Sequence, residues 1–184
     1  MKLVVAITGA SGALYAQRLL DNLRAQEVHL VLSDYAKEVA ALELDGGKLA
    51  VADGVVCYDN RSMRAPFVSG SARFDAMVVI PCSMGTLGRI ASGMSDDTIC
   101  RAADVFLKER RKLILVPRET PYSLIHVRNM ERLIEAGADI IPASPSFYSR
   151  PQTVQQVVDT VVARVLDHLD IGHKLAKRWM ETES

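Results

Sequence analysis

The chain has no excess of charge of either sign. Lys plus Arg and Asp plus Glu each number 22 among its 184 residues, so the formal net charge is zero. This balance argues against a nucleic-acid-binding protein, because such proteins usually carry a basic excess. It leaves room for a local basic pocket that binds a small anion.

Cysteine pairs at metal-site spacing and long apolar runs are also missing. The three cysteines, Cys57, Cys82 and Cys100, form no CxxC motif and have no histidine at zinc-ligand spacing. They are typical of reduced thiols in a cytoplasmic protein. The apolar run at the N-terminus is broken by glycine too soon for a signal peptide or a membrane span. We therefore expect a cytoplasmic protein without a metal, membrane or nucleic-acid partner.

Several well-known catalytic and nucleotide-binding motifs are absent. There is no Gly-Lys-Ser/Thr sequence, which excludes a P-loop, and the loop at residues 8–12 lacks the third glycine of the dinucleotide fingerprint. Without that glycine, Asp34 gives little support for an NAD enzyme. HExxH and GxSxG are missing too. Asp96 and Asp97 are better explained as N-caps of the following helix than as magnesium ligands.

Short apolar runs alternate with longer amphipathic segments, the pattern of βα units around a parallel sheet. We expect strands at 3–7, 28–32, 77–80, 113–116 and 140–141, and helices from near 13 and at 35–44, 97–109, 125–136 and 154–169. Residues 45–75 are irregular. The pattern predicts a single α/β domain over residues 1–184, Rossmann-like (flavodoxin-like) and doubly wound, with a tail from about residue 170.

Polar loops follow the predicted strands at their carboxyl ends, where open α/β sheets bind ligands. Residues 8–12 form a glycine loop that opens a helix, and its N–H groups favour an anion, typically a phosphate. Ser33 and the hydroxyl-rich residues 83–86 follow two other strands, and each of these hydroxyls alone is equally explained as an N-cap. Together the loops favour a phosphorylated planar cofactor.

The strand at 113–116 ends at Pro117 and places Arg118 beside Glu119. A guanidinium can bind a phosphate through two parallel hydrogen bonds, and the neighbouring carboxyl group can transfer a proton. The alternative is a solvated ion pair on the surface. Other basic or hydroxyl side chains that would suit a phosphate are scattered along the sequence, and spacing alone does not group them.

With these motifs assembled, the chain resembles the UbiX family of flavin prenyltransferases over nearly its whole length. The matching segments are TGASGA, LVLSD followed by Leu42-Glu43, PCSMGTLGRIASG, RAADVFLKERRKLILVPRETP, PSFYSRPQTV and the terminal Arg178-Trp179. The resemblance implies FMN as cofactor and dimethylallyl phosphate as donor, with bonds formed at N5 and C6 of the reduced flavin. It also implies a UbiD-type decarboxylase as recipient of the prenylated FMN, and a homododecamer with sites near subunit boundaries.

The resemblance also implies roles for individual residues. The positions that match flavin-binding residues are Gly9, Ala10, Ser11, Ser33, Ser83, Met84, Gly85, Thr86 and Arg118. Those that match the prenyl-phosphate group are Lys108, Glu119, Tyr148 and Arg164, with Arg101 as a further basic position. Glu119 is expected to protonate the leaving phosphate, and Ser11 and Glu43 to remove the C6 proton. The sequence departs from the family pattern at 45–75 and 122–126.

Two alternatives stay open at this point. A flavin-dependent cysteine decarboxylase of the same fold would carry an early catalytic histidine and an Asn-Met pair in a Pro-rich motif. Here the early histidine is missing, and Asn129-Met130 lies within the predicted helix at 125–136. A flavin carrier without turnover would have no need of Glu119 or Lys108. Trp179 is interpreted as a surface latch or as a lid on the substrate.

Overall fold

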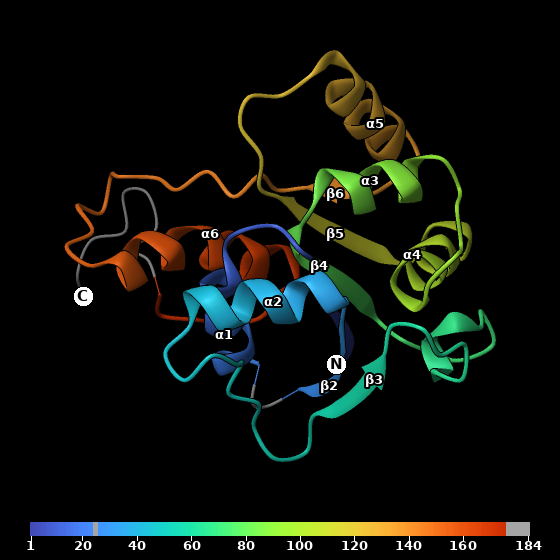
Figure 1. Ribbon diagram of the computed structural model, residues 1–184, viewed down its shortest axis with the longest axis horizontal. Coiled ribbons are helices and arrows are strands. Elements are labelled where there is room, and N and C mark those ends of the chain that lie inside the picture. Colours follow the sequence, from blue (N-terminus) through green and yellow to red (C-terminus); the bar gives the residue numbers. More distant parts are fainter. Residues whose placement is uncertain (24–25, 176–184) are drawn as a thin grey trace.

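The computed structural model describes residues 1–23 and 26–175. Its strands form one six-stranded sheet in the order β3-β2-β1-β4-β5-β6, and every pairing is parallel. The strands are β1 (Lys2–Ile7), β2 (Glu27–Leu32), β3 (Val56–Asp59), β4 (Ala76–Cys82), β5 (Lys112–Pro117) and β6 (Asp139–Ile140). The predicted α/β class and parallel sheet are confirmed (Figure 1).

Helices connect the strands and cover both faces of the sheet (Figure 1). They are α1 (Ala13–Asp21), α2 (Asp34–Glu43), α3 (Met84–Ala91), α4 (Thr98–Lys108), α5 (Leu124–Glu135) and α6 (Val154–His168), with a short 3₁₀ helix η1 (Pro66–Val68). The helix at 97–109 begins one residue later than predicted because Asp97 is its N-cap. The Asp97 carboxylate accepts the N–H of Cys100 at 2.7 Å, which confirms the capping interpretation.

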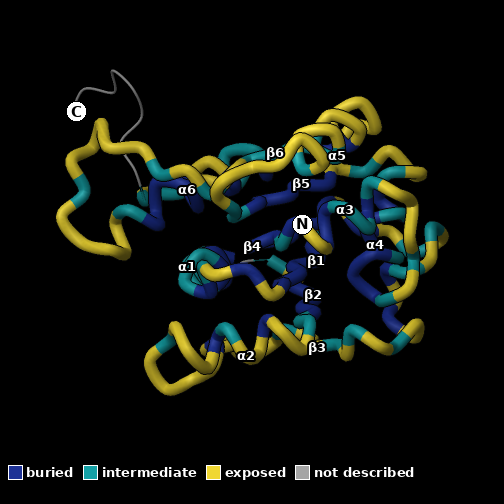
Figure 2. Tube along the Cα trace, turned by 45° about the horizontal axis from the view of Figure 1, so that its top comes forward, coloured by how far each residue is buried: buried dark blue, intermediate teal, exposed yellow. Residues whose placement is uncertain are grey.

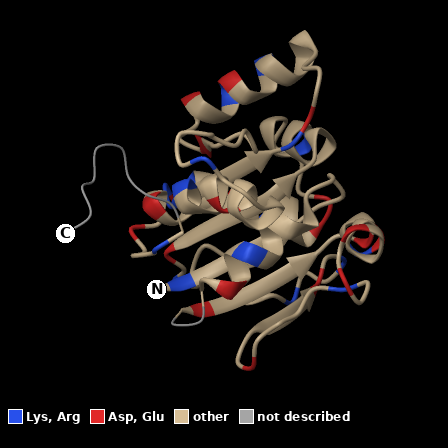
Figure 3. Cartoon of the chain, turned by 90° about the vertical axis from the view of Figure 1, so that its left-hand side faces the viewer, with Lys and Arg blue, Asp and Glu red and all other residues tan. Residues whose placement is uncertain are grey.

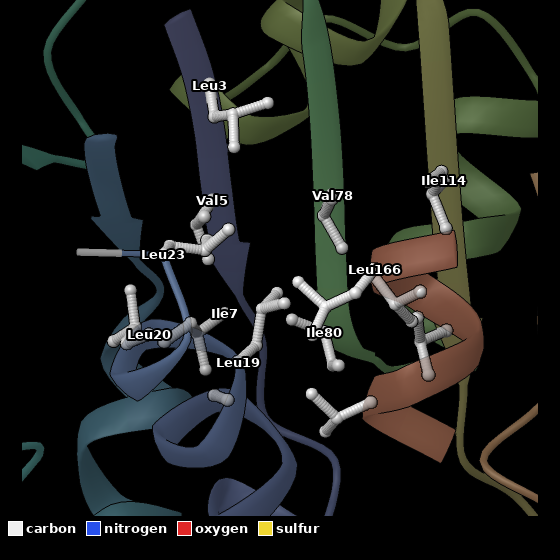
Figure 4. Close-up of a cluster of buried hydrophobic side chains, with 14 of the residues drawn as sticks. Leu3, Val5, Ile7, Leu19, Leu20, Leu23, Val78, Ile80, Ile114 and Leu166 are labelled. Atoms are coloured by element: carbon white, nitrogen blue, oxygen red, sulfur yellow. The ribbon is translucent and has the colours of Figure 1, made fainter. Parts of the chain in front are cut away.

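Alternate side chains of each strand enter two separate cores, as the period of two in a strand requires. On one face Val5, Ile7 and Val78 pack with α1 and α6 (Figure 4). On the other face Val4 and Val79 pack with α3, α4 and η1. The central strands are almost wholly buried, which explains why their apolar runs were readable in the sequence.

Residues 45–75 contain an element that the sequence did not reveal. β3 is an edge strand of four residues and leaves most of its side chains exposed, so it lacks the apolar run that marked the central strands.

The chain also exposes apolar side chains on α5 and on the segment 144–154, which project from the body (Figure 2). Within the described residues no helix has both the length and the apolar character to cross a membrane. Arg178 and Trp179 lie outside the described residues.

Candidate functional site

The carboxyl ends of β1 and β4 are tied together by Thr8, a buried residue that sequence reasoning did not single out. Its Oγ1 donates to the carbonyl of Pro81 at 2.8 Å and accepts the N–H of Ser83 at 2.7 Å. The glycine loop after β1 is thus fixed against the hydroxyl-rich loop after β4. Because the strand order reverses between β1 and β4, ligands of open α/β sheets bind at this point.

The N-terminus of α1 already holds an anion, the carboxylate of Glu43 at the end of α2. Its Oε2 accepts the N–H groups of Gly12 and Ala13, both at 2.8 Å, and the Ser11 side chain hydrogen-bonds to the same carboxylate. Burial raises the pKa of Glu43, but these hydrogen bonds and the charge of Arg118 together leave it below its ordinary value. The N–H groups of Gly12 and Ala13 are therefore taken by the chain's own carboxylate, and a phosphate would have to bind other donors of the loop.

Two glycines shape this loop for physical reasons. A Cβ atom on Gly9 would lie 2.3 Å from the Cβ of Tyr35, so only glycine lets the loop approach α2 this closely. Gly12 has a φ of 119°, a conformation that L side chains rarely adopt, and it is the N-cap of α1. The glycine pattern of the sequence thus marks packing and backbone needs at the loop that carries Ala10 and Ser11.

Arg118 joins this loop from the end of β5. Its Nε donates to the carbonyl of Ser11 at 3.1 Å, and its backbone N–H donates to the carbonyl of Cys82 at 3.3 Å. The ring of Tyr15 lies close by: burial raises the pKa of its hydroxyl, and the charge of Arg118 partly opposes this. The predicted convergence of the glycine loop and Arg118 is therefore present in one chain, and Glu43 joins it from the end of α2. Glu119 follows directly, half-buried, with Oε1 accepting the N–H of Thr120 at 3.0 Å.

Ser33 and Ser83 both cap helices. Ser33 Oγ accepts the N–H of Ala36 at 3.1 Å, and Ser83 Oγ accepts the N–H of Thr86 at 3.3 Å. At α3, in contrast to α1, no hydrogen-bond partner for the N–H groups of Met84 and Gly85 is present among the described residues.

A Cβ atom on Gly85 would meet nothing within 4 Å, so this helix N-terminus is open on that side. An anionic or carbonyl oxygen of a flavin fits there, because the first N–H groups of a helix need an acceptor from outside the helix.

The residues predicted to hold the prenyl phosphate do not converge within one chain. Lys108 is the last residue of α4, before β5 begins, whereas Arg118 follows the end of β5. A six-residue strand rising about 3.3 Å per residue puts its two ends roughly 17 Å apart. Lys108 therefore lies near the amino ends of the strands and Arg118 near their carboxyl ends. Arg101 donates to the carbonyl of Val68 at 3.1 Å and is held against η1.

The last two of these residues lie on the surface of the C-terminal third of the chain. Tyr148 is 82% exposed in the projecting segment 144–154. Arg164 is on α6, with its side chain 63% exposed and paired with Asp167 at 3.0 Å. A phosphate that contacts all of these groups needs residues from more than one copy of the chain.

A cavity of about 330 Å³ lies elsewhere, between the ends of α4 and α5 at the amino edge of the sheet, and is lined by Leu107, Arg110, Arg111, Lys112, Ala136, Gly137 and Asp139. Two of its basic side chains already donate hydrogen bonds to backbone carbonyls. Arg111 donates to the carbonyls of Ala72 and Gly70 at 2.7 and 2.6 Å, and Lys112 donates to the carbonyl of His168. We therefore place the candidate site at the carboxyl edge, where the polar loops converge.

Comparison with known proteins decides the family. The Flavoprotein family profile matches residues 1–166. The flavin prenyltransferase UbiX of Methanocaldococcus jannaschii is 48% identical over 181 residues, which cover 97% of this chain and 98% of that protein. The chain belongs to the UbiX flavin prenyltransferase family.

Two solved structures of UbiX-type proteins share the fold. The crystal structure of AnUbiX in complex with FMN and dimethylallyl pyrophosphate has a TM-score of 0.91 and 43% identity, covering 99% of this chain and 98% of that one. A dodecameric FMN-dependent UbiX-like decarboxylase from Escherichia coli O157:H7 also has a TM-score of 0.91, with 45% identity, covering 98% and 100%. The resemblance stated from the sequence motifs is confirmed.

Three residues near these loops received no role from the sequence: Tyr15, and Thr8 and Arg89, which lie within the matching segments TGASGA and PCSMGTLGRIASG. Thr8 had one usable signal, since it is the first polar residue after a buried strand and precedes Gly9. Tyr15 and Arg89 lie within amphipathic helices, where a polar side chain is ordinarily solvated. Their position near the loops depends on how the helices pack.

Proposed function

We propose that this chain is a flavin prenyltransferase that joins the dimethylallyl group of dimethylallyl phosphate to N5 and C6 of reduced FMN. The observation that carries the proposal is the bond from Arg118 Nε to the Ser11 carbonyl, which brings a cation and the adjacent Glu119 to the glycine loop. Similarity to a UbiX structure that contains FMN and a dimethylallyl donor supports the same conclusion.

The residues at the carboxyl edge suit FMN. Thr8 fixes the two loops, the N–H groups of Met84 and Gly85 offer donors, and Ser33 lines the adjacent helix start. When bound, the reduced flavin supplies the nucleophilic atoms N5 and C6, so the chain needs no nucleophile of its own.

The protein groups in this proposal stabilise charge and move protons. Arg118 would bind and orient a phosphate group through its two-pronged set of hydrogen-bond donors. Glu119 holds the proton that lets the phosphate leave as a weaker base. The Ser11 side chain hydrogen-bonds to the Glu43 carboxylate. We therefore assign the two residues a joint role: the C6 proton would pass to the Ser11 oxygen while the Ser11 hydroxyl proton passes to the Glu43 carboxylate.

We further propose that the active form is a homo-oligomer, a dodecamer like the Escherichia coli O157:H7 relative. α5 exposes Leu124 and Ile125 by about seven-tenths of their surface, and Tyr148 is more exposed still. Contiguous exposed apolar side chains mark protein–protein contacts. Assembly would also let Lys108 and Arg164 of one copy reach the Arg118–Glu119 pair of another.

The product would pass to a UbiD-type decarboxylase in the cytoplasm, where the three unpaired cysteines would stay reduced. We take residues 1–184 as one functional unit, with the tail from about residue 170.

The test of the reaction is anaerobic incubation with reduced FMN and dimethylallyl phosphate, followed by mass spectrometry of the released flavin. We expect the mass to rise by one five-carbon prenyl unit. Glu119→Gln should abolish the gain while FMN still binds. Unmodified flavin that binds tightly would instead favour the cysteine decarboxylase or a flavin carrier.

Subunit complementation tests the shared site. Lys108→Met and Glu119→Gln should each be inactive, but copies of the two variants assembled together should regain activity. The matched control combines Glu119→Gln with Arg118→Met, whose lost groups belong to the same half-site, and should regain none. Absence of complementation in the first mixture would show that Lys108 does not act across a subunit boundary.

A further inference from the structure

Arg89, in the last turn of α3, links the hydroxyl-rich loop to the start of α4. Its Nη1 donates to Asp97 Oδ2 at 2.7 Å and to Asp96 Oδ1 at 3.1 Å. Its Nη2 reaches back one turn and donates to Thr86 Oγ1 at 3.4 Å. The guanidinium fork thus contacts an anionic anchor on one side and a residue of the candidate flavin site on the other.

The hydrogen bonds around Thr86 fix the direction of its own proton. Thr86 Oγ1 accepts from Ser83 Oγ at 3.1 Å and from Arg89, which can only donate. A hydroxyl oxygen has two lone pairs and one proton. With both lone pairs engaged, the hydroxyl must act as a donor, and no acceptor for its proton is present in the part of the chain that the structure describes.

Thr86 is only 4% exposed, so bulk water is a poor candidate for that acceptor. It lies in the first turn of α3, where the N–H groups of Met84 and Gly85 also have no partner within the described ranges. Donors that lack an acceptor and share one helix start suit a ligand oxygen.

We propose that Arg89 is a positioning residue, which holds the Thr86 hydroxyl as a hydrogen-bond donor to an oxygen of the bound flavin. The inference rests on the proposed function, because it takes FMN as the ligand. The proposed role is one of geometry: Asp96 and Asp97 both contact the guanidinium, so its positive charge is already compensated by theirs.

The anchor on the α4 side is firmly held. Asp97 Oδ1 accepts the N–H of Cys100 at 2.7 Å, and Oδ2 also accepts from Asn60 Nδ2 at 3.2 Å. Burial raises the pKa of Asp97, but the bonds from Cys100 and Arg89 lower it more, so the carboxylate stays charged at neutral pH. Arg89 therefore has a fixed position from which to orient Thr86.

The test measures FMN affinity by quenching of flavin fluorescence in a double-mutant cycle. Arg89→Met and Thr86→Val should each raise the Kd for FMN about tenfold, the loss of one hydrogen bond to the ligand. Arg89→Met should have no further effect in the Thr86→Val background. Asp96→Asn, which leaves the Thr86 bond in place, should bind FMN like the unmodified chain.

Each other result overturns the inference. An unchanged Kd in Arg89→Met would show that Thr86 needs no positioning. The same loss in the Thr86→Val background would show that Arg89 acts on the scaffold. If Arg89→Met does not fold, Arg89→Lys keeps a charge for Asp97 but lacks the planar fork, so its Kd should still rise; wild-type affinity would refute the geometry. An unmodified chain that does not bind FMN would refute the proposed function itself, and this inference with it.

Discussion

Glu43 is the residue whose removal gives the sharpest test of how the glycine loop is built. Its carboxylate accepts two backbone N–H groups at the start of α1, both at 2.8 Å, from residues 31 and 30 positions earlier in the sequence. The N-cap of α1, Gly12, offers no side-chain cap of its own. Replacing Glu43 with alanine should therefore uncap α1 as well as loosen the loop.

The expected cost follows from the exposure of these bonds. Hydrogen bonds to a charged acceptor contribute about 1.5–3 kcal/mol each when buried. Glu43 is exposed, however, so water can replace part of the interaction, and the scale for losing a helix N-cap, about 0.5–2 kcal/mol, applies better. We expect Glu43→Ala to lose about 1.5 kcal/mol, which lowers the Tm by about 4 °C for a chain of this size. Glu43→Gln keeps an acceptor and should lose about half as much.

Thermal unfolding at one fixed protein concentration provides the assay, because oligomerisation makes the Tm depend on concentration. The matched control is Glu38→Ala, which removes the same side chain from an exposed position on the same helix. It should leave the Tm unchanged. If Glu43→Ala melts together with Glu38→Ala, the carboxylate does not cap α1.

The pH dependence of the same difference tests the charge. The pKa of Glu43 in the folded chain is lowered, so its contribution is fully present above the unfolded pKa and is lost as the pH falls through the folded value. The gap between the unmodified chain and Glu43→Ala should therefore be constant near neutral pH and close in acid. A gap that persists at a pH below the folded pKa would falsify the assignment of the stabilisation to the charged form.

Three further predictions concern other parts of the fold. Arg18 and Asp159 form a two-pronged ion pair at 2.7 and 2.8 Å between α1 and α6; Arg18→Met should leave a buried carboxylate and cost about 3 kcal/mol in denaturant unfolding, and a loss below about 1 kcal/mol would contradict this. Cys57 is exposed, whereas burial raises the pKa of Cys82 to about 12. A thiol reagent near neutral pH should thus label Cys57 quickly and Cys82 only after unfolding. Ile125→Lys on the exposed face of α5 should reduce the mass measured by light scattering, and an unchanged mass would place α5 outside the oligomer contacts.

The sequence predicted the fold well because the central strands are buried on both faces. β1, β4 and β5 are continuous apolar runs, and such runs are readable without any partner. β3 was not predicted, because this edge strand exposes most of its side chains and so lacks a continuous apolar run. Charged residues on α5 alternate in sign along its surface, at the top of Figure 3, and gave no pattern beyond a solvated helix.

The site residues also differ in how far the sequence could indicate their positions. The meeting of Ser11 and Arg118 could be expected from the sequence, because both lie in loops that follow parallel strands and the carboxyl ends of such strands lie at one end of the sheet. What the sequence could not show is competition for donors: residues 12 and 13 offer N–H groups to any anion, and only the packing of α2 shows that Glu43 takes them. The same limit applies to Lys108, whose distance from Arg118 is set by the length of β5. Because Lys108 lies near the amino ends of the strands, it would reach this site only from a second copy of the chain. The complementation experiment therefore tests the assembly and the chemistry together, since each half of the cationic set is incomplete without the other.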